Sequence, residues 1–341
     1  MARCTKPAAS VYRSRFEGVN LSPLATGRSN AAGYNDPFAN LKVRLSNAPQ
    51  RAWETAELKH LIVNADDFGY TSGVNRAIVE AHRTGIVTST SLMATGAAFE
   101  DAVQRSRSNP ALDIGCHLNL VEGRPLSSPG RIPHLVKPNG KFYNLVGLGL
   151  RVAAGRVPMS EVEREFDAQT EKIIAAGIRP SHLDTHQHTH LHPKIAAVLA
   201  GVGERYGIRW VRRLCENCTP PLREGAWRRR IVAAASYLFV ASLQRQMDRH
   251  GLRTPDAFTG FVLTGRLSAA GLRATLAGLP EGVTELMCHP GYCDQDLMTA
   301  PTMLKHKREI EFRIFADASW GEWLRERDIV LTSFRGLTSA G

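Results

Sequence analysis

Five of the chain's twelve histidines lie within eleven residues, from His182 to His192, and Asp184 lies among them. Successive side chains of an extended strand point to opposite faces, so a strand here would place His182, Asp184, His186 and His188 on one face. Imidazoles and a carboxylate on one face can bind Zn²⁺, Mn²⁺ or Fe²⁺, and a mixed nitrogen and oxygen site also suits Mg²⁺. The alternative is a solvated histidine-rich loop that binds metal only incidentally.

Other carboxylate and imidazole side chains lie at the ends of apolar runs elsewhere in the chain. They are Asp66 and Asp67, His117 and His289. A hydrolytic metal site needs a few ligands that leave one position open for water, and a base that takes the proton of that water. Adjacent aspartates can divide these two roles, because neighbouring side chains point in different directions. His289 is the candidate acid that protonates the leaving group. Serine-hydrolase chemistry has less support, because the sequence lacks a G-x-S-x-G motif.

These residues must be positioned by a regular alternation of strands and helices that begins after residue 58. Roughly seven or eight strand–helix repeats predict an α/β protein with a mostly parallel sheet. We expect a distorted, TIM-like (β/α) barrel, with an open doubly wound sheet as the alternative. Active sites of such barrels lie at the carboxyl ends of several strands.

The expected elements follow from the apolar periods and from the helix start and stop signals. Strands are expected at 61–65, 86–93, 112–117, across the histidine-rich stretch and at 208–211, 258–263, 284–289 and 329–332. Helices are expected at 72–84, 98–107, 160–177, 193–206 and 226–249, from 268 and at 302–325. Ser72 is the expected cap of the first helix, and Ser160 with Glu163 has the spacing of a capping box.

Residues 1–57 differ from the rest in composition, being rich in Ser, Asn, Arg and Ala, poor in acids and without an apolar period. We expect a basic, disordered N-terminal extension, or else an organelle-style leader or a start codon placed too far upstream. The catalytic domain is expected to span residues 58–337.

The overall composition sets limits on partner and compartment. The net charge of +11 would suit nucleic acid, but the basic residues are scattered and form no known nucleic-acid-binding module. Six cysteines in 341 residues do not indicate a disulfide scaffold, and no secretory signal is present, so we expect a cytoplasmic protein. Within helix 226–249 the apolar run 231–243 is too short to span a bilayer. We expect it to pack in the core, with peripheral membrane contact as the alternative.

Five motifs in order resemble one known family. They are Asn64–Gly69 (NADDFG), Gly85–Ser91 (GIVTSTS), Gly115–Leu118 (GCHL), His182–His188 (HLDTHQH) and Glu285–Gly291 (ELMCHPG). Over about residues 59–335 the chain resembles the YdjC-like carbohydrate deacetylases, which include chitooligosaccharide deacetylases and a hopanoid-biosynthesis-associated branch. Two segments depart from the shorter oligosaccharide enzymes, namely the N-terminal extension and residues 215–256. The second is closer to the hopanoid-associated branch and raises a lipid-linked amino sugar as a candidate substrate.

The resemblance implies a distorted (β/α) barrel, a homodimer and one divalent metal ion, Mg²⁺ or Zn²⁺. It also implies removal of the acetyl group from an N-acetylated sugar. It assigns Asp67, His117 and His186 as metal ligands, Asp66 as the general base and His289 as the general acid. Asp184 and His188 are then expected to support the metal-bound imidazoles or to line the substrate site.

Two other functions remain open on the residues alone. One is another barrel metallohydrolase, of the amidohydrolase or phosphoesterase type, because His186-Gln187-His188 also matches their H-x-H pattern. The other is a noncatalytic metal- or nucleic-acid-binding protein, which would show salt-dependent binding to nucleic acid. A noncatalytic binding function gives no reason for Asp66 and His289 to lie at strand ends.

Overall fold

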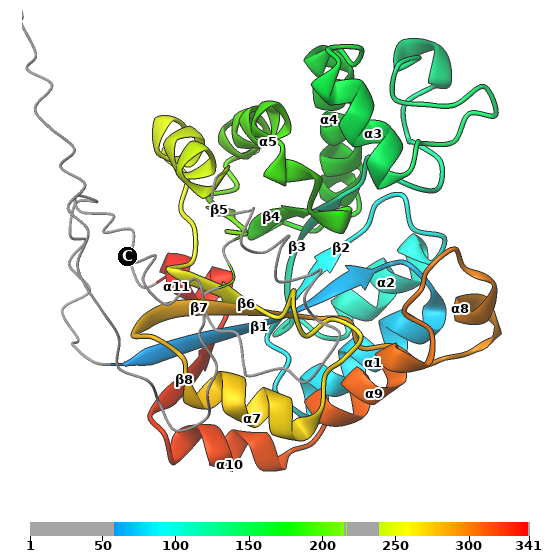
Figure 1. Ribbon diagram of the computed structural model, residues 1–341. Helices are drawn as coiled ribbons and strands as arrows, with labels where there is room; N and C mark the ends of the chain where they lie inside the picture. The colour runs from blue at the N-terminus through cyan, green and yellow to red at the C-terminus, as the bar shows by residue number, and fades with distance from the viewer. Residues whose placement is uncertain (1–57, 215, 217–238, 340–341) are drawn as a thin grey trace, which may run out of the picture. The chain divides into compact units, whose positions relative to one another are not determined.

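The computed structural model describes residues 58–214, 216 and 239–339 (Figure 1). The predicted extension over 1–57 lies outside this range, as does most of the predicted helix 226–249, whose residues 239–249 are helical. The predictions that concern the remainder of these two segments therefore stay predictions.

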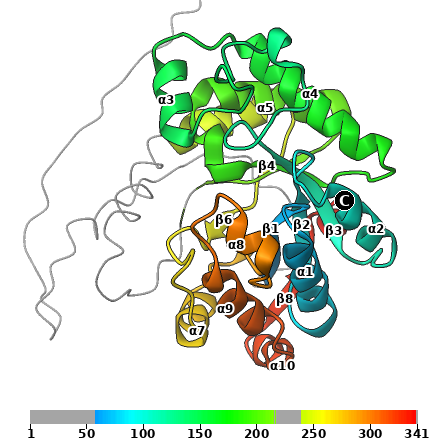
Figure 2. The same cartoon turned by 90° about the vertical axis from the view of Figure 1, so that its right-hand side faces the viewer.

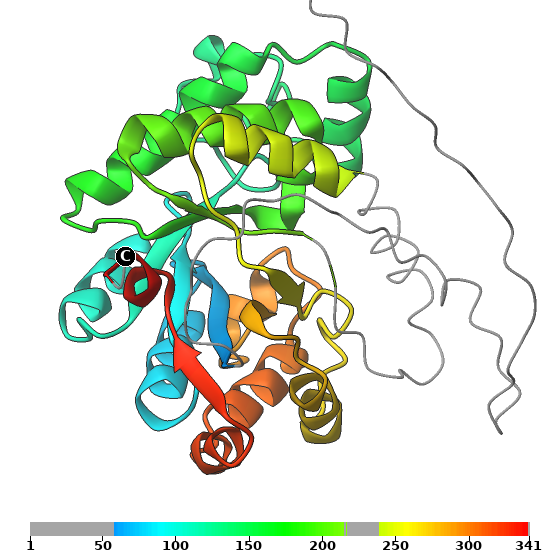
Figure 3. The ribbon, with the colours of Figure 1, turned by 90° about the vertical axis from the view of Figure 1, so that its left-hand side faces the viewer.

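The described residues contain one sheet of eight strands, and every paired neighbour runs parallel. The strand order is β5-β4-β3-β2-β1-β7-β6, and β8 pairs with the first part of β1 beside this path (Figure 3). The strands are β1 (Lys59–Phe68), β2 (Ser89–Leu92), β3 (Asp113–Leu118), β4 (His182–Thr185), β5 (Trp210–Val211), β6 (Ala257–Thr259), β7 (Gly282–Cys288) and β8 (Ile329–Thr332).

Helices connect these strands and lie on both sides of them (Figure 2). Helices α4 and α5 lie on one side, whereas α1, α7, α9 and α10 lie on the other. The α-helices are α1 (Ser72–Thr84), α2 (Phe99–Arg107), α3 (Leu145–Ala153), α4 (Met159–Ala175), α5 (Pro193–Tyr206), α7 (Ala269–Ala277), α8 (Gln295–Thr299), α9 (His306–Phe315), α10 (Ser319–Arg325) and α11 (Phe334–Ser339). Two 3₁₀ turns complete the order, η1 (Pro129–Arg131) and η2 (His186–Leu191).

Alternate residues of β1 serve two different cores. Leu61, Val63 and Ala65 belong to the large apolar cluster that includes buried residues of the surrounding helices. Ile62 belongs to a smaller cluster with Trp210, Val283, Phe334 and Leu337, so its face of the sheet is covered by α11. Burial on both faces explains why the β1 sequence is a nearly continuous apolar run rather than a strict alternation.

The two ends of the strand path approach each other. An isolated parallel bridge joins Glu216, a few residues after β5, to Phe258 in β6. The sheet therefore curls into a distorted TIM-like barrel, which confirms the predicted fold class and excludes the open doubly wound alternative. The carboxyl ends of the strands consequently surround one common region.

Several predicted helix details were wrong. Thr71, not Ser72, caps α1, because its hydroxyl accepts the backbone N–H of Val74 at 3.2 Å. Helix α4 begins at Met159 without a side-chain cap, so the expected capping box at Ser160 is absent. The helix expected over 302–325 is divided into α9 and α10. Within the described chain, no helix has the length and apolar character that crossing a bilayer requires.

Candidate active site

Asp66 and Asp67 lie at the carboxyl end of β1 and both face the site. Strict alternation would turn one of them away, but the pairing register between β1 and β2 shifts between Ala65 and Phe68. Asp67 also has a φ of 70°, in the left-handed region that non-glycine residues rarely adopt. This bulge lets two adjacent carboxylates, each about 2% exposed, serve one site.

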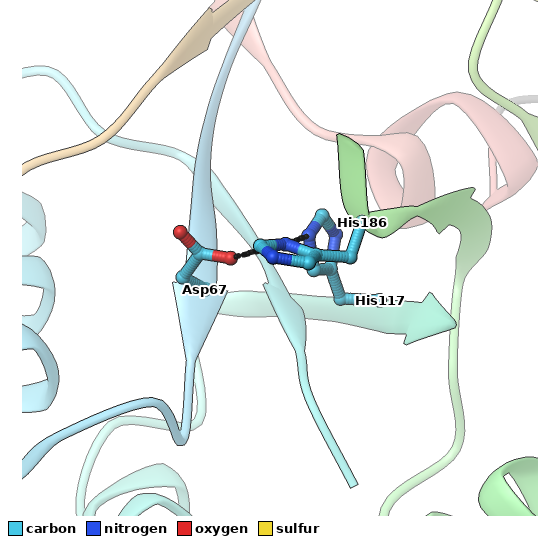
Figure 4. Close-up of side chains that lie close together, drawn as sticks. All are labelled: Asp67, His117 and His186. Atoms are coloured by element: carbon cyan, nitrogen blue, oxygen red, sulfur yellow. Dashed lines mark hydrogen bonds and ion pairs between the residues drawn. The ribbon is translucent and has the colours of Figure 1, made fainter. Parts of the chain in front are cut away.

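His117 and His186 complete a compact group with Asp67 (Figure 4). His117 is on β3, and His186 begins the 3₁₀ turn directly after β4. Asp67 Oδ1 lies 3.3 Å from His117 Nε2 and 3.0 Å from His186 Nδ1, and the two nitrogens are 3.2 Å apart. The structure therefore brings together the three residues predicted as metal ligands.

A buried carboxylate fixes the orientation of His117. Asp184 Oδ1 lies 2.8 Å from His117 Nδ1, and neither side chain is more than 2% exposed. Burial alone lowers the pKa of His117, but the Asp184 carboxylate outweighs burial and raises that pKa to about 10. Because Asp184 accepts the Nδ1 proton, Nε2 is the nitrogen directed toward Asp67 and His186. A metal ion there would replace the Nε2 proton, and this arrangement is usual for metal-binding histidines.

Arg212 links three buried carboxylates, and it was not among the site residues predicted from the sequence. Its guanidinium lies 2.7 Å and 2.8 Å from the two oxygens of Asp66, 2.8 Å from Asp184 and 2.7 Å from Glu285. It is fully buried, directly after β5. Its position could have indicated this role, because Arg212 lies at the end of a predicted strand, as do Asp66, His117 and His289.

A second missed arginine holds the other oxygen of Asp67. Arg308 on α9 is 2% exposed and donates from its guanidinium to Asp67 Oδ2. Burial by itself would raise the pKa of Asp67, but Arg308 and His186 hold that pKa well below its usual range. Nothing in the local sequence of α9 indicates this contact, because the two residues are 241 positions apart.

The Asp67–His117–His186 group fits a divalent cation in three respects. Its edges of 3.0–3.3 Å match ligand atoms about 2.1 Å from a common ion, which are about 3.0 Å apart in octahedral and about 3.4 Å in tetrahedral geometry. Asp67 Oδ1 is buried, yet among the described residues it has no hydrogen-bond partner of acceptable geometry. Two nitrogen donors and one oxygen donor suit both Zn²⁺ and Mg²⁺ or Mn²⁺.

The charge of the surrounding network leads to the same conclusion. Two arginines, Arg212 and Arg308, are bonded to four buried carboxylates, those of Asp66, Asp67, Asp184 and Glu285. Once a cation has replaced the Nε2 proton of His117 and all four carboxylates are ionised, the four negative and two positive charges leave a net charge of −2 around that cation. Burial of uncompensated charge is costly, and a divalent cation would balance it.

His289 lies beside Asp66, as an acid in this site would have to. Its Nε2 is 3.9 Å from Asp66 Oδ2, and its backbone N–H donates to Glu311 at 2.7 Å. Burial lowers the pKa of His289, although the Asp66 carboxylate opposes this effect. Burial therefore favours the neutral form of this imidazole.

The other histidines of the histidine-rich stretch do not share one strand face, so that part of the prediction was wrong. Strand β4 ends at Thr185, and Gln187 and His188 adopt left-handed backbone angles. His182 instead stacks on Phe334 with ring centroids 4.0 Å apart. His188 is buried edge-on against Phe258 and Phe261, where burial and then Arg212 hold its pKa well below the usual value.

Backbone strain is concentrated around this site. Five described non-glycine residues have a positive φ, and four of them, Asp67, Glu122, Gln187 and His188, lie in or beside it. Each such residue costs of the order of 1–3 kcal/mol, so the surrounding structure must hold it in place. The side chains of Glu122 and Gln187 are joined by a hydrogen bond of 2.9 Å.

A pocket of about 590 Å³ opens beside His186. Its walls come from the loops after β1, β2 and β3, from the start of α2, and from α8 with the residues after it. The lining residues include the polar Tyr70, Thr95 and Asn119 and residues with small side chains, among them Ala97 and Ala300. Such a lining, with one proposed metal ligand at its edge, suits a polar ligand of small size.

Comparison with known proteins gives consistent matches over the described domain. The sequence model of the YdjC-like protein family matches residues 60–326. A carbohydrate deacetylase of Brevibacillus brevis is 32% identical over 278 residues, which cover 81% of this chain and 99% of the relative. A chitooligosaccharide deacetylase of Klebsiella pneumoniae is 35% identical over 241 residues, covering 70% and 84% respectively. A solved structure from Enterococcus faecalis, described as a candidate cellobiose-phosphate cleavage protein, has a TM-score of 0.68 and 29% identity over 82% of this chain and 99% of its own.

Proposed function

Because this chain belongs to the YdjC-like protein family, we propose that it is a carbohydrate deacetylase, a hydrolase that cleaves the amide bond of an N-acetylated amino sugar. The proposed substrate is an N-acetylglucosamine oligosaccharide or a lipid-linked N-acetylglucosamine. One observation carries the proposal. The Asp67–His117–His186 group lies beside a second carboxylate, Asp66, and an imidazole, His289, and its member His186 also lines a pocket of about 590 Å³.

Asp67, His117 and His186 would hold one divalent cation, Zn²⁺ or Mg²⁺. When bound, such a cation would polarise the amide carbonyl and lower the pKa of water at the site. Asp184 supports this arrangement by holding His117 in the required tautomer. Arg308 keeps Asp67 ionised, which favours cation binding over protonation of the carboxylate.

Asp66 is the proposed general base, and its contacts restrict this role to one oxygen. Oδ1 accepts from Arg212, from Asn64 at 3.0 Å and from Ser91 at 3.4 Å. Oδ2 accepts only from Arg212 among the described residues, so one of its lone pairs remains for a proton. This lone pair is on the oxygen nearer to His289.

His289 is the proposed general acid. Because burial favours its neutral form, His289 would take up a proton within the site before it protonates the departing amine. The separation of 3.9 Å from Asp66 Oδ2 allows transfer through a small adjustment or one water molecule. Arg212 holds Asp66 in position throughout.

The test is acetate release from N-acetylglucosamine, di-N-acetylchitobiose and a lipid-linked N-acetylglucosamine, each with Zn²⁺, with Mg²⁺ or with a chelator. We expect metal-dependent acetate release that disappears in Asp66→Asn and His186→Ala. Asp328→Asn is the matched control, because Asp328 also has a left-handed backbone but is exposed and precedes β8.

The outcomes separate the candidate functions. Acetate release from the lipid-linked sugar alone would identify lipid-linked N-acetylglucosamine, rather than an oligosaccharide, as the substrate. Metal binding through His186 without turnover of any acetylated sugar would refute the deacetylase and favour another barrel metallohydrolase. Salt-dependent binding to nucleic acid with no hydrolysis would favour the noncatalytic function.

A further inference from the structure

We propose that Glu122 makes this site selective for sugars that carry a free, protonated amine close to the N-acetyl group that is removed. This inference rests on the proposed deacetylase function and specifies its substrate class. Glu122 follows β3 and was not among the residues selected from the sequence. Glu122 and His186 both line the pocket.

The structure holds Glu122 in place at a conformational cost. Its backbone has a φ of 63°, its N–H donates to the Tyr143 carbonyl at 3.2 Å, and its carbonyl accepts from the Asn119 amide at 3.3 Å. Gln187 donates to Oε1 at 2.9 Å, which leaves Oε2 facing His186 Nε2 at 4.0 Å. Strain of this kind at a non-glycine residue is typical of functional positions.

Glu122 lies close to the proposed metal ligands, which determines how near its carboxylate is to a substrate bound at the metal. His186 presents Nδ1 to Asp67 and its other nitrogen to Glu122. The carboxylate is therefore separated from the proposed metal position by a single imidazole ring. A sugar whose acetamido group lies at the metal would place its own substituents, or those of the adjoining ring, against Glu122.

The charge of the pocket lining points to a cationic ligand. The chain as a whole has a net charge of +11, but the described residues that line the pocket include four acids and neither lysine nor arginine. The acids come from different elements, namely Glu100 and Asp101 from α2, Glu122 from the loop after β3 and Asp296 from α8 (Figure 1). Asp101 is paired with Arg105 at 2.9 Å, whereas no cationic side chain of the described chain comes closer to Glu122 Oε2 than His186.

Such a lining discriminates between the substituents of otherwise similar sugars. An ammonium group can bond to Glu122 Oε2 and gains from the negative field of the other acids. A hydroxyl group makes only a neutral-to-charged hydrogen bond there. A phosphate group would meet like charges, and the described lining residues include no lysine or arginine to bind it, which disfavours its binding. The inferred substrate is therefore a partly deacetylated amino-sugar oligosaccharide, supplied by a reaction that exposes one amine first.

The test is direct calorimetric binding to the metal-loaded Asp66→Asn protein, which is not expected to turn the ligands over. The probes are the mono-deacetylated chitobiose, di-N-acetylchitobiose and a 6-phosphorylated di-N-acetylchitobiose. At a pH of about 6.5, where the amine is protonated, we expect the mono-deacetylated sugar to bind about tenfold more tightly than the neutral one, and the phosphorylated sugar to bind most weakly. Adding Glu122→Gln should reduce the tenfold preference to roughly twofold or less.

Adding Glu281→Gln is the matched control, because Glu281 is exposed and precedes β7 at the opposite end of the strands. It should leave the preference unchanged. Equal binding of the amine and neutral sugars, tightest binding of the phosphorylated sugar, or an unchanged preference in Glu122→Gln would each overturn the inference. Absence of acetate release by the wild-type protein, with this binding preference intact, would instead refute the deacetylase function.

Discussion

Replacing Glu285 by glutamine should change how the stability of the metal-free protein depends on pH. Glu285 on β7 is fully buried, and one of its oxygens accepts from Arg212 Nε at 2.7 Å. Its second oxygen has no hydrogen-bond partner among the described residues. Burial raises the pKa of Glu285 from 4.5 to about 7, because the attraction of Arg212 is insufficient and the charges of Asp184 and Asp66 add to the effect.

The magnitude follows from proton linkage. The folded protein binds this proton more tightly than the unfolded chain, so the free energy of unfolding must fall as the pH rises from about 4.5 to about 7. At about 1.36 kcal/mol per pH unit, the difference between these two pKa values amounts to roughly 3 kcal/mol. Glutamine at this position retains an oxygen for Arg212 but cannot ionise, so the variant should lack this loss.

The assay is urea unfolding of wild type and Glu285→Gln in chelator, at several pH values from about 5 to about 8. The stability of the variant relative to wild type should increase by about 2–3 kcal/mol over this range. Glu281→Gln is the control, because Glu281 is an exposed glutamate just before the same strand, and its difference from wild type should not vary with pH. A constant difference for Glu285→Gln as well would refute the conclusion that Glu285 is a buried carboxylate with a raised pKa.

Three further predictions concern the same network. Asp184→Asn should weaken Zn²⁺ binding to the metal-free protein by about 10- to 100-fold, measured by calorimetry, because His117 loses the carboxylate that orients it. An unchanged Zn²⁺ affinity would contradict this role of Asp184. Arg212→Met should lower the free energy of unfolding at neutral pH by about 3–5 kcal/mol in urea, because three buried carboxylates lose the cation that they share. The loss should shrink in acid as these carboxylates protonate, and a loss independent of pH would count against this cause. Gly115→Ala should lower the free energy of unfolding by about 1–3 kcal/mol, because the added Cβ would lie 2.4 Å from the His182 ring. Gly201→Ala, where nothing lies within 4 Å of the added Cβ, should not destabilise the protein by this mechanism, and an equal loss in both variants would refute the steric cause.

Much of the fold and part of the candidate site could be predicted from the sequence. The alternation of apolar runs and amphipathic segments predicted the parallel α/β barrel. Each strand or helix has its own spacing of apolar residues, and this spacing can be recognised within a few neighbouring residues. The ends of those runs predicted that Asp66, Asp67, His117 and His289 would gather, since parallel strands share one carboxyl edge. The structure brings these residues together, and their catalytic roles remain predictions.

Tertiary structure alone decided how the charges are paired and which histidines face the site. Arg212 meets Asp66 across 146 positions and Arg308 meets Asp67 across 241, so both contacts depend on strand order and barrel closure rather than on local pattern. The bulge in β1 turns two adjacent aspartates inward, and the left-handed turn after β4 directs His186 to the site while His182 stacks on α11. A sequence carries the spacing of side chains along one element, whereas their partners across elements are set by register and packing, which only the folded chain defines.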